Sequence, residues 1–86
     1  MARLKITRAT GEVIDATITP AIEYAFELYA KKGFSRAFRE DEKQTDIYWL
    51  AWECLRKSGE TVPMFGLPFI ETLAKVEVLD DEVPNE

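Results

Sequence analysis

Two short alternating segments near the start of the chain constrain its fold most strongly. Polar and apolar side chains alternate over residues 3–8 (RLKITR) and again over residues 12–18 (EVIDATI). Pairing residues whose numbers add up to 20 places Ile6 opposite Ile14 and leaves Gly11 at the end of a three-residue loop, where a positive φ is usually required. The apolar face of the resulting hairpin comprises Leu4, Ile6, Ile14, Ala16 and Ile18. An isolated hairpin is only marginally stable in water, so this face must rest on helices.

The next segments carry helix signals. Thr19 and Pro20 suit the N-cap and the first turn of a helix over residues 20–32, which Gly33 would end in a left-handed conformation. At about 100° per residue, the residues assigned to its core stripe are Ile22, Ala25, Phe26 and Tyr29, with Tyr24 and Leu28 on the opposite side. A second helix is predicted over residues 42–58, with Arg56 and Lys57 in its last turn.

A third helix is predicted over residues 67–76, beginning near Pro68. Residues 76–79 (VEVL) either prolong this helix or form a short strand against the hairpin, because β-branched residues favour both readings at this length, and we favour helix followed by coil. The sequence therefore predicts an α+β fold that is mainly helical, with one compact domain over residues 1–79. Residues 80–86 are expected to form a flexible, disordered acidic tail.

Six consecutive apolar residues, 47–52 (IYWLAW), interrupt the charged pattern of the second helix. On a helical wheel the residues assigned to the core are Ile47, Leu50, Ala51, Cys54 and Leu55, and they are flanked by Tyr48 and Trp52. Trp49 falls nearly opposite them, beside Glu53 and Arg56. An apolar residue on the outer side of a helix indicates either a neighbouring loop or a partner surface.

The charge and composition exclude several classes of function. The net charge of −5 arises entirely from residues 77–86, so the rest of the chain is neutral and carries no basic patch for nucleic acid. No apolar run approaches the roughly 20 residues of a membrane span, and basic residues interrupt any signal peptide. The chain has no histidine, and its one cysteine, Cys54, is expected to be a core residue. We therefore expect no enzyme activity, no catalytic residue, no metal site and no cofactor.

Most of the chain, from residue 18 onward (ITPAIEYAFE), resembles a family of phage proteins. The segments that carry the resemblance are AFRED, YWLAWEC and the closing VEVLDD. They are similar to the tail assembly chaperones of actinobacteriophages, small proteins encoded just before the tape measure protein of long-tailed phages. In that family a programmed ribosomal frameshift often yields a second, longer product that shares the N-terminal part.

The resemblance implies a chaperone that binds the tape measure protein, keeps it soluble and helps recruit tail tube subunits. Such a protein would act in the host cytoplasm during assembly and be absent from the mature virion. Its expected partners are the tape measure protein, the major tail tube protein and, as a homo-oligomer, further copies of itself. The residues expected to contact tape measure helices are Trp49, Tyr48, Trp52, Tyr24 and Leu28, surrounded by a polar rim of Arg36, Arg39, Glu53 and Arg56.

Two rival functions stay open at this stage. The first is a structural component of the virion, such as a head–tail connector or a minor tail protein, in which the same apolar faces make permanent contacts. The second is a small acidic regulator that inhibits a host enzyme or mimics nucleic acid. Rows of surface charge would favour this second reading, whereas the net charge of this chain lies in its last ten residues.

Overall fold

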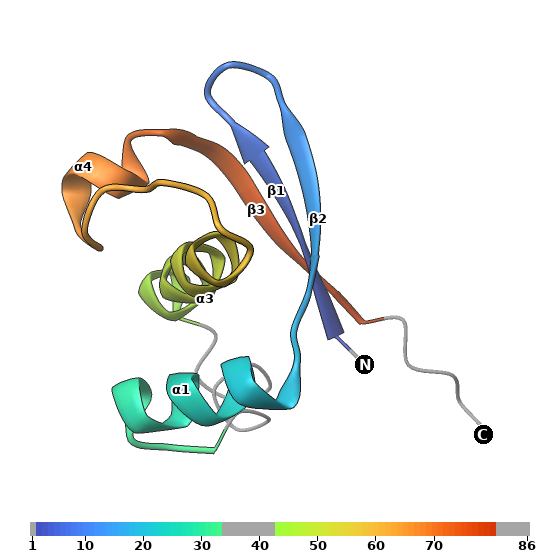
Figure 1. Cartoon of the computed structure of the whole chain (residues 1–86), viewed down its shortest axis with the longest axis vertical. Coiled ribbons are helices and arrows are strands. Elements are labelled where there is room, and N and C mark those ends of the chain that lie inside the picture. Colours follow the sequence, from blue (N-terminus) through green and yellow to red (C-terminus); the bar gives the residue numbers. More distant parts are fainter. Residues whose placement is uncertain (1, 34–42, 81–86) are drawn as a thin grey trace.

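The computed structural model describes residues 2–33 and 43–80, which form three strands and three helices (Figure 1). In chain order these are β1 (Ala2–Arg8), β2 (Val13–Thr17), α1 (Pro20–Ala30), α3 (Gln44–Lys57), α4 (Leu67–Ile70) and β3 (Leu73–Asp80). The strands form one antiparallel sheet in the order β2-β1-β3. Helix α3 lies against one face of this sheet, and α1 lies beyond the end of β2 (Figure 1).

The predicted hairpin is confirmed in its register and its turn. Ile6 pairs with Ile14, as the alternation required. The Arg8 N–H donates to the Glu12 carbonyl at 2.8 Å and closes the loop, in which Gly11 has a φ of 98°. Only glycine adopts this conformation without a steric cost, so the turn is specified locally by the sequence.

The predicted helix over residues 67–76 is wrong. Helix α4 is a single turn that ends at Ile70, and the chain then enters β3, which pairs with β1 over its whole length. In this sheet Val76 lies opposite Ile6 and Val78 lies opposite Leu4. These β-branched side chains suit a sheet surface. In the strand, the backbone N–H and C=O groups form hydrogen bonds with β1 in place of the bonds that they would form within a continued helix. With a third strand of eight residues, the fold is α+β and not mainly helical. Asp80, assigned to the tail, is the last residue of this strand.

Helix α1 begins as predicted and ends earlier. The Thr19 hydroxyl accepts a hydrogen bond from the Ile22 N–H at 3.3 Å, and Pro20 occupies the first turn. The helix ends at Ala30 because Lys31 takes the left-handed conformation, with a φ of 60°, that the sequence assigned to Gly33. The Lys31 N–H still donates to the Glu27 carbonyl at 2.8 Å, so the last turn is closed by the backbone of a lysine.

Side chains from all three helices of the described residues and from the sheet form one core. Its fully or almost fully buried apolar members are Leu4, Ile6, Ile18, Ile22, Phe26, Leu50, Ala51, Cys54, Leu55 and Phe69. Two acidic side chains, Asp46 and Glu53, are buried with them. Lys32, two residues beyond the end of α1, places its Nζ 3.4 Å from an Asp46 carboxylate oxygen, and this ion pair joins the segment that follows α1 to the first turn of α3. Both helices are therefore fixed relative to the sheet.

Candidate partner-binding surface

Four aromatic side chains from three segments form a closed ring at the surface, which we call the aromatic surface. Its members are Tyr29 of α1, Trp49 and Trp52 of α3, and Phe65 of the loop before α4. Tyr29 and Trp49 stack with their centroids 4.6 Å apart and their planes 8° from parallel. The other three neighbouring pairs have centroid distances of 5.9, 6.1 and 6.2 Å. All four side chains keep part of their surface exposed to solvent.

The buried core and one hydrogen bond hold the four side chains of the aromatic surface in place. Phe26, which is fully buried, lies beneath it with its ring centroid 6.1 Å from that of Trp49. The Trp52 Nε1 donates to the Pro63 carbonyl at 2.8 Å, which attaches the loop that carries Phe65 to helix α3. Buried Phe69 supports Phe65 from the other side, at 6.4 Å. Because the rings are ordered before any partner arrives, binding on them would lose little side-chain entropy.

The helical wheel predicted that Trp49 faces away from the core, and this prediction is wrong. Trp49 is half-buried and packs against the core between Phe26 and Tyr29. The helical-wheel assignment assumes that a helix is covered on one side only, but α3 is covered by the sheet on one side and by α1 on another. Its buried arc is therefore wide enough to include part of Trp49, and Tyr29 rather than a partner covers one face of the indole.

The expected polar rim is only partly present. Glu53 is 2% exposed, so it belongs to the core and not to the rim. Arg56 makes a forked pair with it, at 3.0 Å and 3.2 Å to the two carboxylate oxygens. The Arg56 guanidinium also lies 5.1 Å from the centroid of the Trp52 ring, within the range of a cation–π contact. Arg56 therefore neutralises a buried carboxylate and borders the aromatic surface at once.

The remaining predicted contact residues do not join the aromatic surface. Tyr24 and Leu28 are 67% and 62% exposed and form a separate apolar stripe on α1. Tyr48 is half-buried, and its hydroxyl accepts a hydrogen bond from Gln44 at 3.4 Å. Arg36 and Arg39 lie outside the described residues.

Sequence reasoning missed two members of the aromatic surface and two exposed apolar residues close to one of them in the sequence. Tyr29 was assigned to the core, although it is 40% exposed. Phe65 was read only as part of a loop, between Met64 and Leu67, which are 86% and 65% exposed. The run MFGL within a segment rich in proline and glycine was the available signal, because loops are usually polar and an apolar loop residue needs a place to pack.

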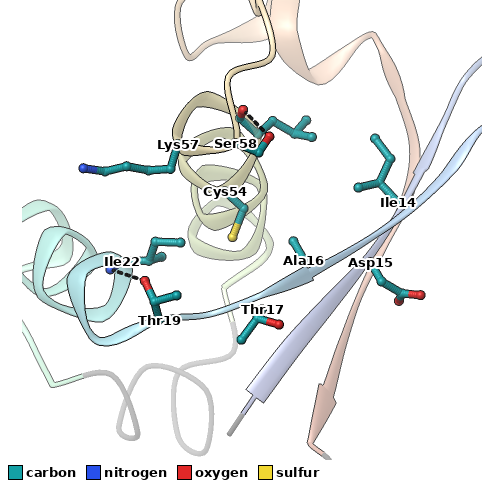
Figure 2. A pocket seen from close by; sticks show the side chains of 10 residues that line it. Ile14, Asp15, Ala16, Thr17, Thr19, Ile22, Cys54, Lys57 and Ser58 are labelled. Carbon is teal, nitrogen blue, oxygen red and sulfur yellow. Dashed lines mark hydrogen bonds between the residues drawn. The ribbon is translucent and has the colours of Figure 1, made fainter.

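A concave feature lies between β2, the start of α1 and the end of α3. It is an open groove with a volume of about 320 Å³ (Figure 2). Ile14, Ala16 and Ile22 line it together with Cys54, and Lys57 stands at its border with its amine pointing away (Figure 2). The Cys54 thiol is a potential nucleophile among the residues that line the groove.

Burial raises the pKa of Cys54 to about 12, and the neighbouring Glu53 carboxylate adds to the rise. We expect alkylation of the native thiol near pH 8 to be slow. A pKa near 12 instead of 9.0 lowers the thiolate fraction about 1,000-fold, and the greater nucleophilicity of a more basic thiolate recovers about twentyfold. Protonation alone should slow alkylation by roughly 40-fold relative to the chain unfolded in guanidinium chloride. Equal rates in the two states would show that Cys54 is accessible and ionised.

Among residues 2–33 and 43–80, no three His, Cys, Asp or Glu side chains are grouped as metal ligands would be. Within the same ranges, every helix is too short or too polar to cross a membrane. Comparison of the chain with protein-family models, curated proteins and solved structures finds no match in any of the three.

Proposed function

We propose that this protein is a phage tail assembly chaperone that binds the tape measure protein during tail assembly. The proposal combines the resemblance of AFRED, YWLAWEC and VEVLDD to that family with one structural observation. The observation is the aromatic surface, in which four partly exposed rings from three segments are held together at one place. Aromatic side chains are enriched where proteins bind each other because each buries a large area with few torsions to fix.

The chemistry of this surface suits an amphipathic helix as the client. The apolar stripe of such a helix fits an apolar platform by side-chain packing, without sequence-specific hydrogen bonds. Met64 and Leu67 are exposed apolar residues close to Phe65 in the sequence, and an unbranched methionine adapts to different side chains. Arg56 at the border offers a charge-assisted contact to acidic residues that flank the stripe. These features favour a binder that accepts many similar helices along one long protein.

Release of the client requires a moderate affinity, and the size of the platform agrees with that. Four partly exposed rings with two flanking side chains form a small contact area compared with a permanent interface. We propose that the chaperone acts in the host cytoplasm, assists recruitment of the major tail tube protein and leaves before the virion is complete. So small a contact area would be unusual for a permanent connector or minor tail protein, whose contacts must persist.

Co-expression with the neighbouring tape measure protein tests the proposal. Wild-type protein should raise the soluble fraction of the tape measure and copurify with it. Met64→Glu is expected to lower capture about tenfold, because it places a charge beside the aromatic surface while its own side chain contributes little to folding. Val13→Glu is the matched control, because Val13 is also an exposed apolar residue but lies on β2. It should leave capture unchanged.

The outcomes separate the rival functions. If wild-type protein leaves the tape measure insoluble, the chaperone proposal is wrong. Mass spectrometry of purified particles gives the second readout, and a stoichiometric amount in mature tails would instead support a structural connector or minor tail protein. Leu28→Glu tests the separate stripe on α1. If it abolishes capture while Met64→Glu does not, the client binds α1 and the aromatic surface is not the binding site.

A further inference from the structure

We propose that the exposed edge of β3 pairs with the β3 edge of a second copy of this chain, joining two three-stranded sheets into one six-stranded sheet. This inference goes beyond the proposed function and does not rest on it. The sheet order β2-β1-β3 leaves β3 at an edge. Among the described residues, no strand lies on the outer side of β3. An eight-residue edge strand presents unpaired backbone groups to any strand of matching pattern.

The direction of the backbone groups follows from the hairpin. The Arg8 N–H points toward β2, since it donates to the Glu12 carbonyl. Alternation along β1 then directs the backbone groups of Lys5 and Thr7 toward β3, where their partners are Glu77 and Lys75. The N–H and C=O groups of Val76 and Val78, which lie between and beyond those partners, therefore point away from β1. They are available to a second strand without any loss of pairing within the sheet.

The charges of β3 specify one register for such a pair. In an antiparallel arrangement centred on Val76, Lys75 of one copy lies opposite Glu77 of the other, and the reverse pair forms by symmetry. Lys75 and Glu77 already share one face of the sheet, with Nζ and a carboxylate oxygen 3.3 Å apart. A twofold pair therefore brings four alternating charges together. Side chains directly opposite each other across two strands interact, and opposite charges stabilise the pair.

Neighbouring registers are disfavoured by the same charges. Centring the pair on residue 75 places two lysines opposite each other, and centring it on residue 77 does the same with two glutamates. Like charges directly opposite are destabilising. The other edge strand, β2, has the sequence VIDAT and carries only Asp15 as a charged residue, so it offers no such complementary pair. Self-association through β3 is therefore the arrangement that the charge pattern favours.

Pairing would also cover apolar surface that one copy leaves partly exposed. Val76 and Val78 lie on the helix-facing side of the sheet, where they are only half-buried. In the pair, the two Val76 side chains lie opposite each other on that side. Because the helices of both copies then cover the same face of the extended sheet, both aromatic surfaces would belong to one assembly.

Sedimentation equilibrium of the wild-type chain and of charge-exchanged variants tests this inference. Wild-type protein should pass from one to two chain masses as its concentration rises. Lys75→Glu alone and Glu77→Lys alone should each raise the dissociation constant at least about tenfold, because every cross-strand pair then joins like charges. An equimolar mixture of the two variants should form a heterodimer, since all its cross-strand pairs again join opposite charges. The double exchange Lys75→Glu with Glu77→Lys should restore the homodimer.

Two further variants keep the result interpretable. Val76→Pro removes an outward N–H and should abolish dimerisation while far-UV circular dichroism shows an intact fold. Asp15→Lys alters the charge of the other edge and should leave the dissociation constant unchanged. The inference is overturned if the wild-type chain stays monomeric at its highest soluble concentration, if the mixture stays monomeric, or if Asp15→Lys weakens association as much as Lys75→Glu does.

Discussion

Replacing Phe26 with alanine is expected to lower the free energy of unfolding by about 3–5 kcal/mol, the range for large aromatic residues removed from a core. Phe26 is fully buried and lies between α1 and α3, with its ring 6.4 Å from Tyr29 and 6.1 Å from Trp49. A domain of 86 residues has a total stability of roughly 4–13 kcal/mol. The substitution therefore removes a large fraction of that stability, and urea titration followed by far-UV circular dichroism measures it.

The same helix supplies the matched control for this prediction. Leu28 is 62% exposed, so Leu28→Ala should change the free energy of unfolding by less than about 0.5 kcal/mol. Phe26→Leu keeps most of the buried volume and should cost less than Phe26→Ala. If Phe26→Ala and Leu28→Ala prove equally mild, α1 does not pack on α3 as described.

Trp49→Ala is expected to have the second large effect, a loss of about 2–4 kcal/mol in the free energy of unfolding. The substitution removes the stack on Tyr29 and the contact with Phe26, and it leaves a void between the two helices. Trp49→Phe should recover much of the loss, because a phenyl ring can still stack on Tyr29. Chemical denaturation of both variants gives the comparison, and a loss below about 1 kcal/mol for Trp49→Ala would show that the indole is not part of the packing.

The packing of Trp49 between the two helices changes how this residue can be used to test binding. From the sequence alone, Trp49 was one of the residues expected to contact tape measure helices, which would make Trp49→Ala a test of binding. Since the indole supports both helices, a loss of capture in this variant would combine a changed contact with a destabilised domain. Exposed residues beside the aromatic surface, such as Met64, separate the two effects because their side chains have few contacts to lose.

The register and turn of the hairpin were predictable because everything that specifies them is local. Alternation over two adjacent segments fixes which face is apolar, and a glycine at Gly11 fixes the turn and hence the register. The start of α1 is equally local, since Thr19 bonds to a backbone group three residues away. In these places the interacting groups are neighbours in the sequence, so no knowledge of the rest of the fold was needed.

Strand β3 and the position of Trp49 were not predictable in the same way. The segment 73–79 (LAKVEVL) suits a strand only once β1 is available to pair with it, and β1 lies some seventy residues earlier in the chain. The environment of Trp49 depends in turn on Tyr29, which reaches it from another helix. A helical wheel gives the angular position of each side chain around one axis, but it contains no information on how many sides of the helix are covered by other elements.

The sequence by itself therefore determined the register of the hairpin, the start of α1 and the excess of aromatic residues that suggests a binding protein. It also identified four buried residues of α3, Leu50, Ala51, Cys54 and Leu55, but not the buried Asp46 and Glu53. The tertiary structure decided which of those aromatic residues meet, how far each is buried, and that β3 leaves a charged edge open. The physical reason is that alternation, caps and turns act between neighbours along the chain, whereas aromatic contacts and sheet edges arise between segments that only folding brings together.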